Sequence, residues 1–442
     1  MNNLYGKPWI MKTLIIGLDG VPRYLLEQLA ASDVMPALQR LIQEGTLHDL
    51  AASIPEISSV SWTSFMTGAD PGTHGIFGFT DIKPGTYQNT FPMFSDLKAP
   101  TFWDQLGQSG KTSVVINQPG TYPARDIPGV LVSGFVAIEL AKAVRPLRYL
   151  APLRRADYDI DIDTQRCRKD HDQLFRELEK TLQGRKAIVE HAWKDVDWDY
   201  FQVVITGTDR LQHYLFSAIE DENHKRHDQA MEYYSKIDGF IKDIWERFHD
   251  SADVEHEGQG FYMLSDHGFT LIEQEVYINA WLKQQGYLAF EKDDPQSLAD
   301  ISPHTKAFAL DPGRIYIHRK DKYPKGKVDR EEAEGLISEI RGKLLDLTYN
   351  NKKVIQMAPT KAEAYHGPET PKGPDLVAVG HHGFDIKGSI TGEDIFRRTD
   401  LTGMHTWDDA FFWSGQDVKD NLVITDLAVV IMDGMLKSRA GG

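Results

Sequence analysis

The chain has 442 residues, of which 41% are hydrophobic and 26% are charged, and its formal net charge is -16. This composition is typical of a globular protein with enough apolar residues for a sizeable core. The acidic balance argues against a surface for nucleic-acid polymers and against a polybasic membrane-binding face. The single cysteine, Cys167, excludes an intramolecular disulfide, and no apolar run approaches the roughly 20 residues that span a bilayer. We therefore expect a cytoplasmic protein without a signal peptide or a membrane anchor.

Strand-like and helical patterns alternate along most of the chain, after a polar leader, MNNLYGKPWI, that we expect to fray. The predicted strands are TLIIGLD, SVVIN, GVLVSG, FQVVITGTD, GFYMLSD and RIYIH. The predicted helices include YLLEQLAA, MPALQRLIQEG, FRELEKTLQGRKAIVEHAWKDV and AMEYYSKIDGFIKDIWERF, and a solvated turn, HDSADVEHEG, follows the last of them. This alternation predicts an α/β fold with a mostly parallel central sheet and helices on both faces.

Two stretches rich in proline, glycine and charge interrupt the alternation, at about 81–165 and 286–400. The first contains KPGTYQNTFP and the basic PLRYLAPLRR, and the second contains HGPETPKGPD and GHHGFDIKGS. Long segments of this kind are typical of insertions that form a cap or a rim. The sequence thus predicts a single α/β domain over residues 1–442, with a cap built from these two insertions.

Three predicted strands run directly into an aspartate: Asp19, Asp209 and Asp266. In an open α/β sheet, ligands bind at the carboxyl ends of the strands, so we expect these acids to share one crevice. Histidines accompany two of them. His213 follows Asp209 by four residues, which places both side chains on one face of a helical turn, and His267 follows Asp266 directly. Carboxylates together with neutral imidazoles suit zinc best, and manganese next.

The segment PEISSVSWTSFMTGADPGTHGIFGF places a group of serines ahead of WTSFM, which is predicted to open a helix. An isolated hydroxyl residue at a helix start is usually an N-cap. The same position offers free N–H groups and a partial positive charge, which would hold a phosphoryl group under attack by a serine. Because a serine is a weak nucleophile, it needs a base or a metal ion. Ser58, with Ser59 and Ser61 beside it, is therefore a candidate nucleophile.

The motifs in their order resemble those of the alkaline phosphatase superfamily, and most of all its bacterial branch of type I phosphodiesterases and nucleotide pyrophosphatases. The ordered set is LDG, PxxSxxxWTSFMTGxxPGxHGIF, TDRLQH, SDHG and GMH, over about residues 12–436, and NQPGTYPA, ALDPGRIYIH and NLVITDLA are also typical of that branch. The resemblance implies a metal-dependent hydrolase of phosphodiester or phosphoanhydride bonds. Its substrate would be a small phosphorylated molecule such as a nucleotide, and the reaction would pass through a covalent phosphoserine.

The resemblance also implies two divalent metal ions, with zinc as the first choice and manganese as the second. The implied ligands form two sets of three, with the nucleophile between them: Asp209, His213 and His405; Asp19, Asp266 and His267; and Ser58. Relatives commonly have threonine at the position of Ser58, and a serine oxygen can do the same chemistry. Four further residues are candidates for contact with the substrate: Ser59, Ser61, His382 and Trp407.

Alternative functions remain open at this point. A phosphomonoesterase of the superfamily adds an arginine or a third metal ion, and the sequence identifies neither. A metal-dependent phosphomutase has an Asn-Ser turn at its nucleophile, which this chain lacks. An alternative of another class is a non-catalytic module that binds a phosphorylated ligand. The presence of Ser58 argues against such a module, because binding alone does not need a nucleophile.

Overall fold

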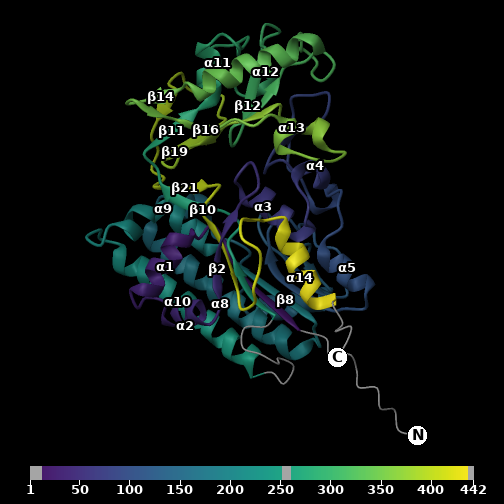
Figure 1. The fold of residues 1–442 in the computed structure, drawn as a ribbon, viewed down its shortest axis with the longest axis vertical. Coiled ribbons are helices and arrows are strands. Elements are labelled where there is room, and N and C mark those ends of the chain that lie inside the picture. The colour runs from purple at the N-terminus through teal and green to yellow at the C-terminus, as the bar shows by residue number, and fades with distance from the viewer. Residues whose placement is uncertain (1–11, 251–259, 437–442) are drawn as a thin grey trace.

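The computed structural model describes residues 12–250 and 260–436. The polar leader lies outside these ranges, and so does the HDSADVEHEG segment apart from its first two residues. Figure 1 shows a lower lobe built around a large sheet and an upper lobe that stands over one end of it. Within the two described ranges, none of the helices combines the length and the apolar character that crossing a membrane requires.

A nine-stranded sheet forms the centre of the lower lobe. In spatial order its strands are β23 (Leu422–Val423), β2 (Thr46–Ala51), β22 (Ala410–Ser414), β9 (Phe261–Leu264), β1 (Thr13–Leu18), β8 (Tyr200–Ile205), β5 (Ser113–Gln118), β6 (Gly129–Ser133) and β7 (Val144–Arg145). The five strands from β9 to β6 are parallel to one another, whereas β22 is antiparallel to β2 and β9, and β7 is antiparallel to β6. The mostly parallel sheet predicted from the sequence is therefore confirmed.

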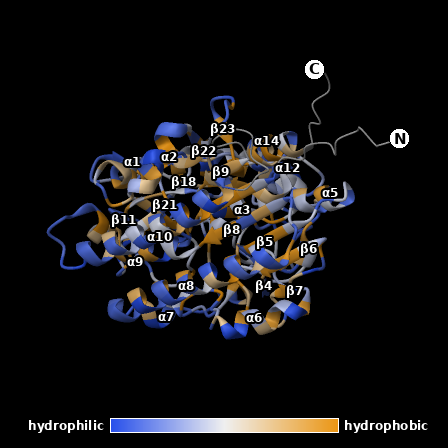
Figure 2. Ribbon diagram, turned by 90° about the horizontal axis from the view of Figure 1, so that it is seen from below, coloured by the Kyte–Doolittle hydropathy of each residue, from blue (hydrophilic) through white to orange (hydrophobic). Residues whose placement is uncertain are grey.

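Alternate residues of the central strands supply two hydrophobic clusters, one on each face of the sheet. Leu14 and Ile16 of β1 belong to one cluster and Ile15 belongs to the other, as the two-residue period of a strand requires. The first face is covered by α1 (Arg23–Ala31), α2 (Pro36–Glu44), α8 (His171–Asp195), α9 (Gly207–Glu220) and α10 (His227–His249). The second is covered by α3 (Ser58–Thr67), α5 (Phe102–Gln108) and α14 (Asp426–Leu436). Figure 2 shows the hydrophobic inner strands, among them β5 and β8, with hydrophilic residues along the outer helices.

The upper lobe, here called the cap lobe, comprises residues 274–397 and has a hydrophobic cluster of its own. It contains the antiparallel strands β12 (Ala307–Leu310), β13 (Arg314–Ile317) and β17 (Leu376–Val377), together with β11 (Gln274–Tyr277), β16 (Ile355–Met357), β18 (Val379–Gly380), β19 (Phe384–Lys387), β20 (Phe396–Arg397), α11 (Ile278–Gln284) and α12 (Arg330–Leu345). Figure 1 shows it as the green upper part of the molecule.

The strand predicted at RIYIH is β13, and it lies in the cap lobe instead of the central sheet. It pairs antiparallel with β12 across the short turn Asp311–Gly313, so it is half of a hairpin and not the end of a parallel crossover. Within the segment 81–165, β5, β6 and β7 belong to the central sheet, while Ile82 and Tyr87 pack against the cap lobe. A cap function for the segments 81–165 and 286–400 stays a prediction.

Candidate active site

The three aspartates at the strand ends lie together at one edge of the central sheet. Asp19 follows β1, Asp266 follows β9, and Asp209 lies in the first turn of α9, which begins just after β8. Because β8, β1 and β9 are parallel neighbours, their carboxyl ends meet at the same edge. The three carboxylates are buried there.

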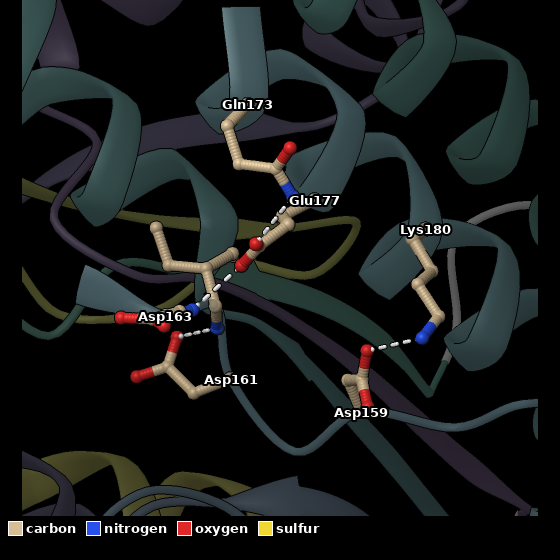
Figure 3. Close-up of a pocket in the computed structure, with 7 residues that line it drawn as sticks. Asp159, Asp161, Asp163, Gln173, Glu177 and Lys180 are labelled. Carbon is tan, nitrogen blue, oxygen red and sulfur yellow. Dashed lines mark hydrogen bonds and ion pairs between the residues drawn. The ribbon is translucent and has the colours of Figure 1, made fainter. Parts of the chain in front are cut away.

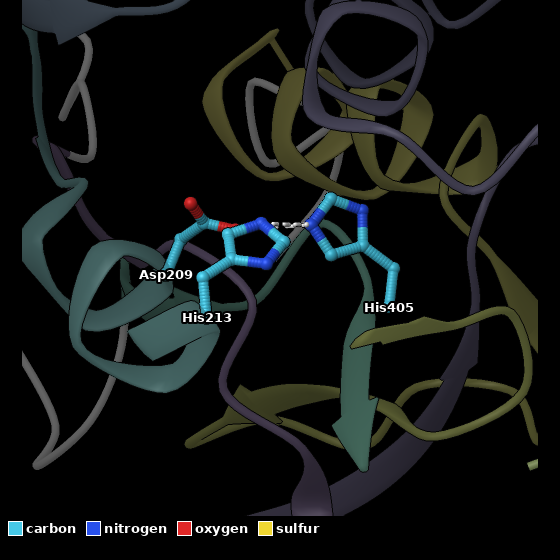
Figure 4. Close-up of side chains that lie close together, drawn as sticks. All are labelled: Asp209, His213 and His405. Atoms are coloured by element: carbon cyan, nitrogen blue, oxygen red, sulfur yellow. Dashed lines mark hydrogen bonds and ion pairs between the residues drawn. The ribbon is translucent and has the colours of Figure 1, made fainter. Parts of the chain in front are cut away.

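Asp209, His213 and His405 form a first group of potential metal ligands, seen in Figure 4. The Oδ1 atom of Asp209 lies 3.4 Å from Nε2 of His213 and 3.1 Å from Nε2 of His405. The first two residues are one turn apart on α9, as the sequence predicts. The third comes from β21 (Gly403–Thr406), a short strand that pairs with β10 (Gly268–Leu271) directly after His267.

Asp19, Asp209 and His267 form a second group, so that Asp209 belongs to both. Nε2 of His267 lies 3.7 Å from Oδ1 of Asp19 and 4.0 Å from Oδ1 of Asp209. Asp266 stands beside this group, with its Oδ2 atom 3.4 Å from Nε2 of His267. The buried Oδ2 atom of Asp266 has no hydrogen-bond partner, while its Oδ1 atom accepts a bond from the N–H of Gly20. An unpartnered buried carboxylate oxygen at this place is what a metal ligand would leave when the ion is absent.

The site histidines share one orientation, which fits metal binding. Each places Nδ1 near a backbone carbonyl: His213 near Gly403 at 3.2 Å, His405 near Glu56 at 2.9 Å, and His267 near Gly268 at 3.0 Å. Because a carbonyl can only accept, Nδ1 carries the proton and Nε2 presents a lone pair. The Nε2 atoms of His213 and His405 are only 3.0 Å apart, and two lone pairs at that distance repel each other unless a cation lies between them.

The electrostatics of the buried carboxylates also favour a bound cation. Burial, reinforced by Asp266 and Asp209, raises the pKa of Asp19 well above its usual value, and burial raises the pKa of Asp266 to about 8. Burial lowers the pKa values of His267 and His405, so both imidazoles are neutral. A cluster of buried carboxylates and neutral imidazoles is a donor set that suits zinc.

Ser58 lies within hydrogen-bond distance of Asp19 and His267, two members of the second ligand group. Its Oγ atom is 3.3 Å from Oδ1 of Asp19 and 3.1 Å from Nε2 of His267. The structure differs from the sequence prediction in one respect, since α3 begins at Ser58 itself, earlier than Trp62. Serine is a weak helix former, but the packing of a helix that is buried along almost its whole length overrides that preference. The N-cap is Ile57, so the hydroxyl of Ser58 is not used as a cap.

Trp62 is a site residue that the sequence analysis did not identify. Its Nε1 atom donates a hydrogen bond of 3.1 Å to Oδ2 of Asp19, which fixes that carboxylate. A Cβ atom on Gly17 would lie 2.5 Å from the Trp62 ring, so glycine is required in β1 for this approach. The signal in the sequence is the four-residue spacing from Ser58, which places both side chains on one face of α3.

The four candidates for substrate contact have different surroundings. Ser59 is buried, and its Oγ atom has no hydrogen-bond partner. Ser61 accepts a hydrogen bond of 3.3 Å from the N–H of Ser53. His382 pairs with Asp408 at 2.7 Å. Trp407 packs against a small hydrophobic cluster made of Phe77, Tyr365, Val377 and Val379.

Removing one imidazole should weaken metal binding by one ligand group and leave the other group unchanged. We expect His405→Ala to bind one metal ion fewer than the wild-type protein, because two remaining protein ligands hold zinc weakly. The measurement is the metal content of purified protein by mass spectrometry. His382→Ala is the matched control, since this histidine belongs to neither group. Unchanged metal content in His405→Ala would contradict the assignment.

Solved structures with a similar fold cover nearly the whole chain. Phosphonoacetate hydrolase from Sinorhizobium meliloti 1021, in complex with phosphonoacetate, is 15% identical over 97% of both chains, with a TM-score of 0.64. Murine ectonucleotide pyrophosphatase/phosphodiesterase 5, an inactive variant in complex with AMP, is 12% identical over 98% of this chain and 97% of that one, with a TM-score of 0.56. A mutant of alkaline phosphatase PafA is 14% identical over 96% of both chains, with a TM-score of 0.55. The chain therefore shares the fold of these proteins, an alkaline phosphatase among them.

A match to a family model identifies the family of the chain. The model described as type I phosphodiesterase / nucleotide pyrophosphatase matches residues 13–408. The chain belongs to this family, as the motifs of its sequence indicated. A comparison with curated protein sequences gives no match.

Proposed function

We propose that this chain is a metal-dependent phosphodiesterase or nucleotide pyrophosphatase that acts on a small substrate through a phosphoserine. The observation that supports it best is the position of Ser58, whose Oγ atom lies at the first residue of α3 and beside Asp19 and His267. A nucleophile, a helix N-terminus and two groups of metal ligands at one sheet edge are what phosphoryl transfer needs. Membership of the type I phosphodiesterase / nucleotide pyrophosphatase family supports the same chemistry.

The proposed cofactors are two divalent metal ions, zinc first and manganese as the alternative. The proposed ligands of the two ions are Asp209, His213 and His405 for one, and Asp19, Asp266 and His267 for the other, with Asp209 within reach of both. When bound, such a pair of ions lowers the pKa of a nearby hydroxyl and offsets the charge that develops on a transferring phosphoryl group.

The residues of the chain would act in two steps. The Oγ atom of Ser58 loses its proton to solvent and attacks phosphorus, so that a bond from phosphorus to Ser58 forms, the bond to the leaving oxygen breaks in line, and that oxygen takes up a proton from solvent. Water then attacks the same phosphorus, breaks the bond to Ser58 and releases the phosphorylated product. Throughout, Trp62 holds Asp19 in place through its indole N–H, and the positive end of α3 stabilises the non-bridging oxygens.

The surroundings of Arg210 favour a diester over a monoester. A monoester carries an extra charge, which a free arginine near the nucleophile would have to offset. Arg210 follows Asp209 directly, but its guanidinium is already hydrogen-bonded to Asp209 and to Asp161. It is therefore not available as an additional phosphate ligand.

The test compares hydrolysis of bis-p-nitrophenyl phosphate, p-nitrophenyl phosphate and phosphonoacetate by protein of known metal content. We expect a preference for the diester that is lost on chelation and restored by zinc or manganese. A preference for the monoester would identify a phosphatase instead. Cleavage of phosphonoacetate alone would identify a phosphonate hydrolase. Inactivity on all three with two metals bound would favour a mutase or a binding module.

A further inference from the structure

The two carboxylate oxygens of Asp209 have different partners. Its Oδ1 atom lies 3.1 Å from His405 and 3.4 Å from His213 in the first ligand group, and 4.0 Å from His267 in the second. Its Oδ2 atom accepts a hydrogen bond of 2.6 Å from Nη1 of Arg210. One oxygen of Asp209 is therefore held by the protein, and the other is left for a metal ion.

The guanidinium of Arg210 is itself held on its remaining sides. Its Nε atom lies 3.1 Å and its Nη2 atom 2.7 Å from Oδ2 of Asp161, and Nε also reaches Oδ1 of Asp161 at 3.2 Å. The ring of Phe135 covers one face, with its centroid 4.7 Å from the guanidinium carbon. The side chains of Arg210 and Asp161 are only 15% and 19% exposed, so this ion pair is well shielded from solvent. Such a shielded and planar pairing restricts the orientation of Arg210.

The loop that carries Asp161 is anchored on α8, as Figure 3 shows. Lys180 pairs with Asp159 at 2.7 Å, and the N–H of Asp163 donates a bond of 2.6 Å to Glu177. Arg185, which is buried, donates to the backbone carbonyls of the same loop. Asp159, Glu177 and Lys180 also line a pocket of about 430 Å³, but their charged groups are already engaged in the contacts that hold the loop. The loop therefore presents Asp161 to Arg210 from a fixed position.

We infer that Arg210, backed by Asp161, is a positioning residue that restricts Asp209 to single-oxygen ligation at the proposed metal centre. This inference rests on the proposed function. The positive charge of Arg210 is offset by Asp161. The pair therefore orients the carboxylate of Asp209 and adds little net charge to the proposed metal centre. Because Oδ2 of Asp209 is hydrogen-bonded to Arg210, Oδ1 is the oxygen that both ligand groups share. Asp209 is therefore kept from binding one ion through both oxygens.

The experiment measures metal binding by the full chain without any reference to turnover. Metal-free protein is titrated with Co²⁺, and the visible absorption and the dissociation constant by chelator competition are recorded for wild type and Arg210→Gln. We expect Arg210→Gln to bind Co²⁺ about 10–100-fold more weakly, because the hydrogen bond that orients Asp209 is lost. We also expect a changed absorption band, because Asp209 is then free to ligate through both oxygens. Arg210→Lys should recover part of the affinity, since it restores a donor but not the planar pairing.

Arg314→Gln is the matched control, because Arg314 is a fully buried arginine in the cap lobe that donates to the carbonyls of Asp311 and Thr80. It should leave Co²⁺ affinity and spectrum unchanged. If Arg210→Gln does not fold, Asp161→Asn tests the same point with Arg210 in place, and we expect a smaller loss with the same spectral change. Wild-type affinity and spectrum in the folded variant would overturn the inference. A wild-type protein that binds no Co²⁺ would instead overturn the proposed function.

Discussion

Ser58→Ala protein is expected to lose hydrolysis of the diester by on the order of 10⁴-fold or more in kcat while it keeps its bound metal. The hydroxyl of Ser58 is placed by the first turn of α3 against Asp19 and His267, so its removal deletes the proposed attacking atom and leaves that carboxylate and that imidazole in the chain. The measurements are initial rates on bis-p-nitrophenyl phosphate and the metal content of the same sample.

Two neighbouring serines provide controls on the same helix. Ser61→Ala removes a hydroxyl that accepts a bond from the N–H of Ser53, and we expect kcat within about a factor of ten of wild type because that bond is structural. Ser59→Ala tests the hydroxyl adjacent in sequence, which lacks a hydrogen-bond partner. A large loss in Ser59→Ala with an active Ser58→Ala would identify Ser59 as the nucleophile. Loss of metal from Ser58→Ala would show that Ser58 is chiefly a ligand.

The parts of the site that follow from local rules could be predicted from the sequence. Apolar runs that end in aspartate identify strand ends, and parallel strands bring Asp19, Asp209 and Asp266 to one sheet edge. The four-residue spacing of Asp209 and His213 fixes their common helix face without any knowledge of the fold. The position of His405 came from the ordered motifs and not from spacing, since the strand that carries it begins far along the chain.

The remaining features depend on packing between distant segments. Asp161 and Arg210 are 49 residues apart, and nothing in the acidic loop DYDIDID distinguishes the residue that pairs with Arg210 from its neighbours. Similarly, RIYIH has the pattern of a buried strand in either sheet, and only its hairpin partner β12 places it in the cap lobe. The start of α3 at Ser58 is set by burial of the whole helix, which overrides the weak helix preference of consecutive serines.

Metal-free protein is expected to lose more stability than zinc-loaded protein as the pH rises from 6.5 to 8.5. In the metal-free fold, burial raises the pKa of Asp266 to about 8, and burial with Asp266 and Asp209 raises that of Asp19 well above its usual value. The folded state therefore binds more protons than the unfolded state in this window, so the free energy of unfolding falls as the pH rises. Asp266 alone accounts for on the order of 2 kcal/mol between pH 6.5 and 8.

The pH window is chosen so that other titrations do not reverse the sign. Burial lowers the pKa values of His267 and His405, which reduces stability mainly below the unfolded value near 6.5 and gives only a small opposite slope just above it, and the lowered pKa of Asp209 acts below its usual 3.8. Burial also raises the pKa of Glu56 to about 7, but this group titrates in both forms of the protein. The informative quantity is therefore the difference between the slopes of metal-free and zinc-loaded protein.

Thermal or denaturant unfolding of both forms at pH 6.5 and 8.5 measures that difference. With zinc bound, Asp19 and Asp266 are expected to be ionised across the window because the ion offsets their repulsion, so their contribution to the slope should disappear. Asp266→Asn is the matched control, since it keeps the shape and the bond from Gly20 but cannot titrate, and it should reduce the slope of the metal-free protein. Equal slopes for the two forms of the wild type would mean that no cation relieves these buried acids, and the metal centre would have to be abandoned.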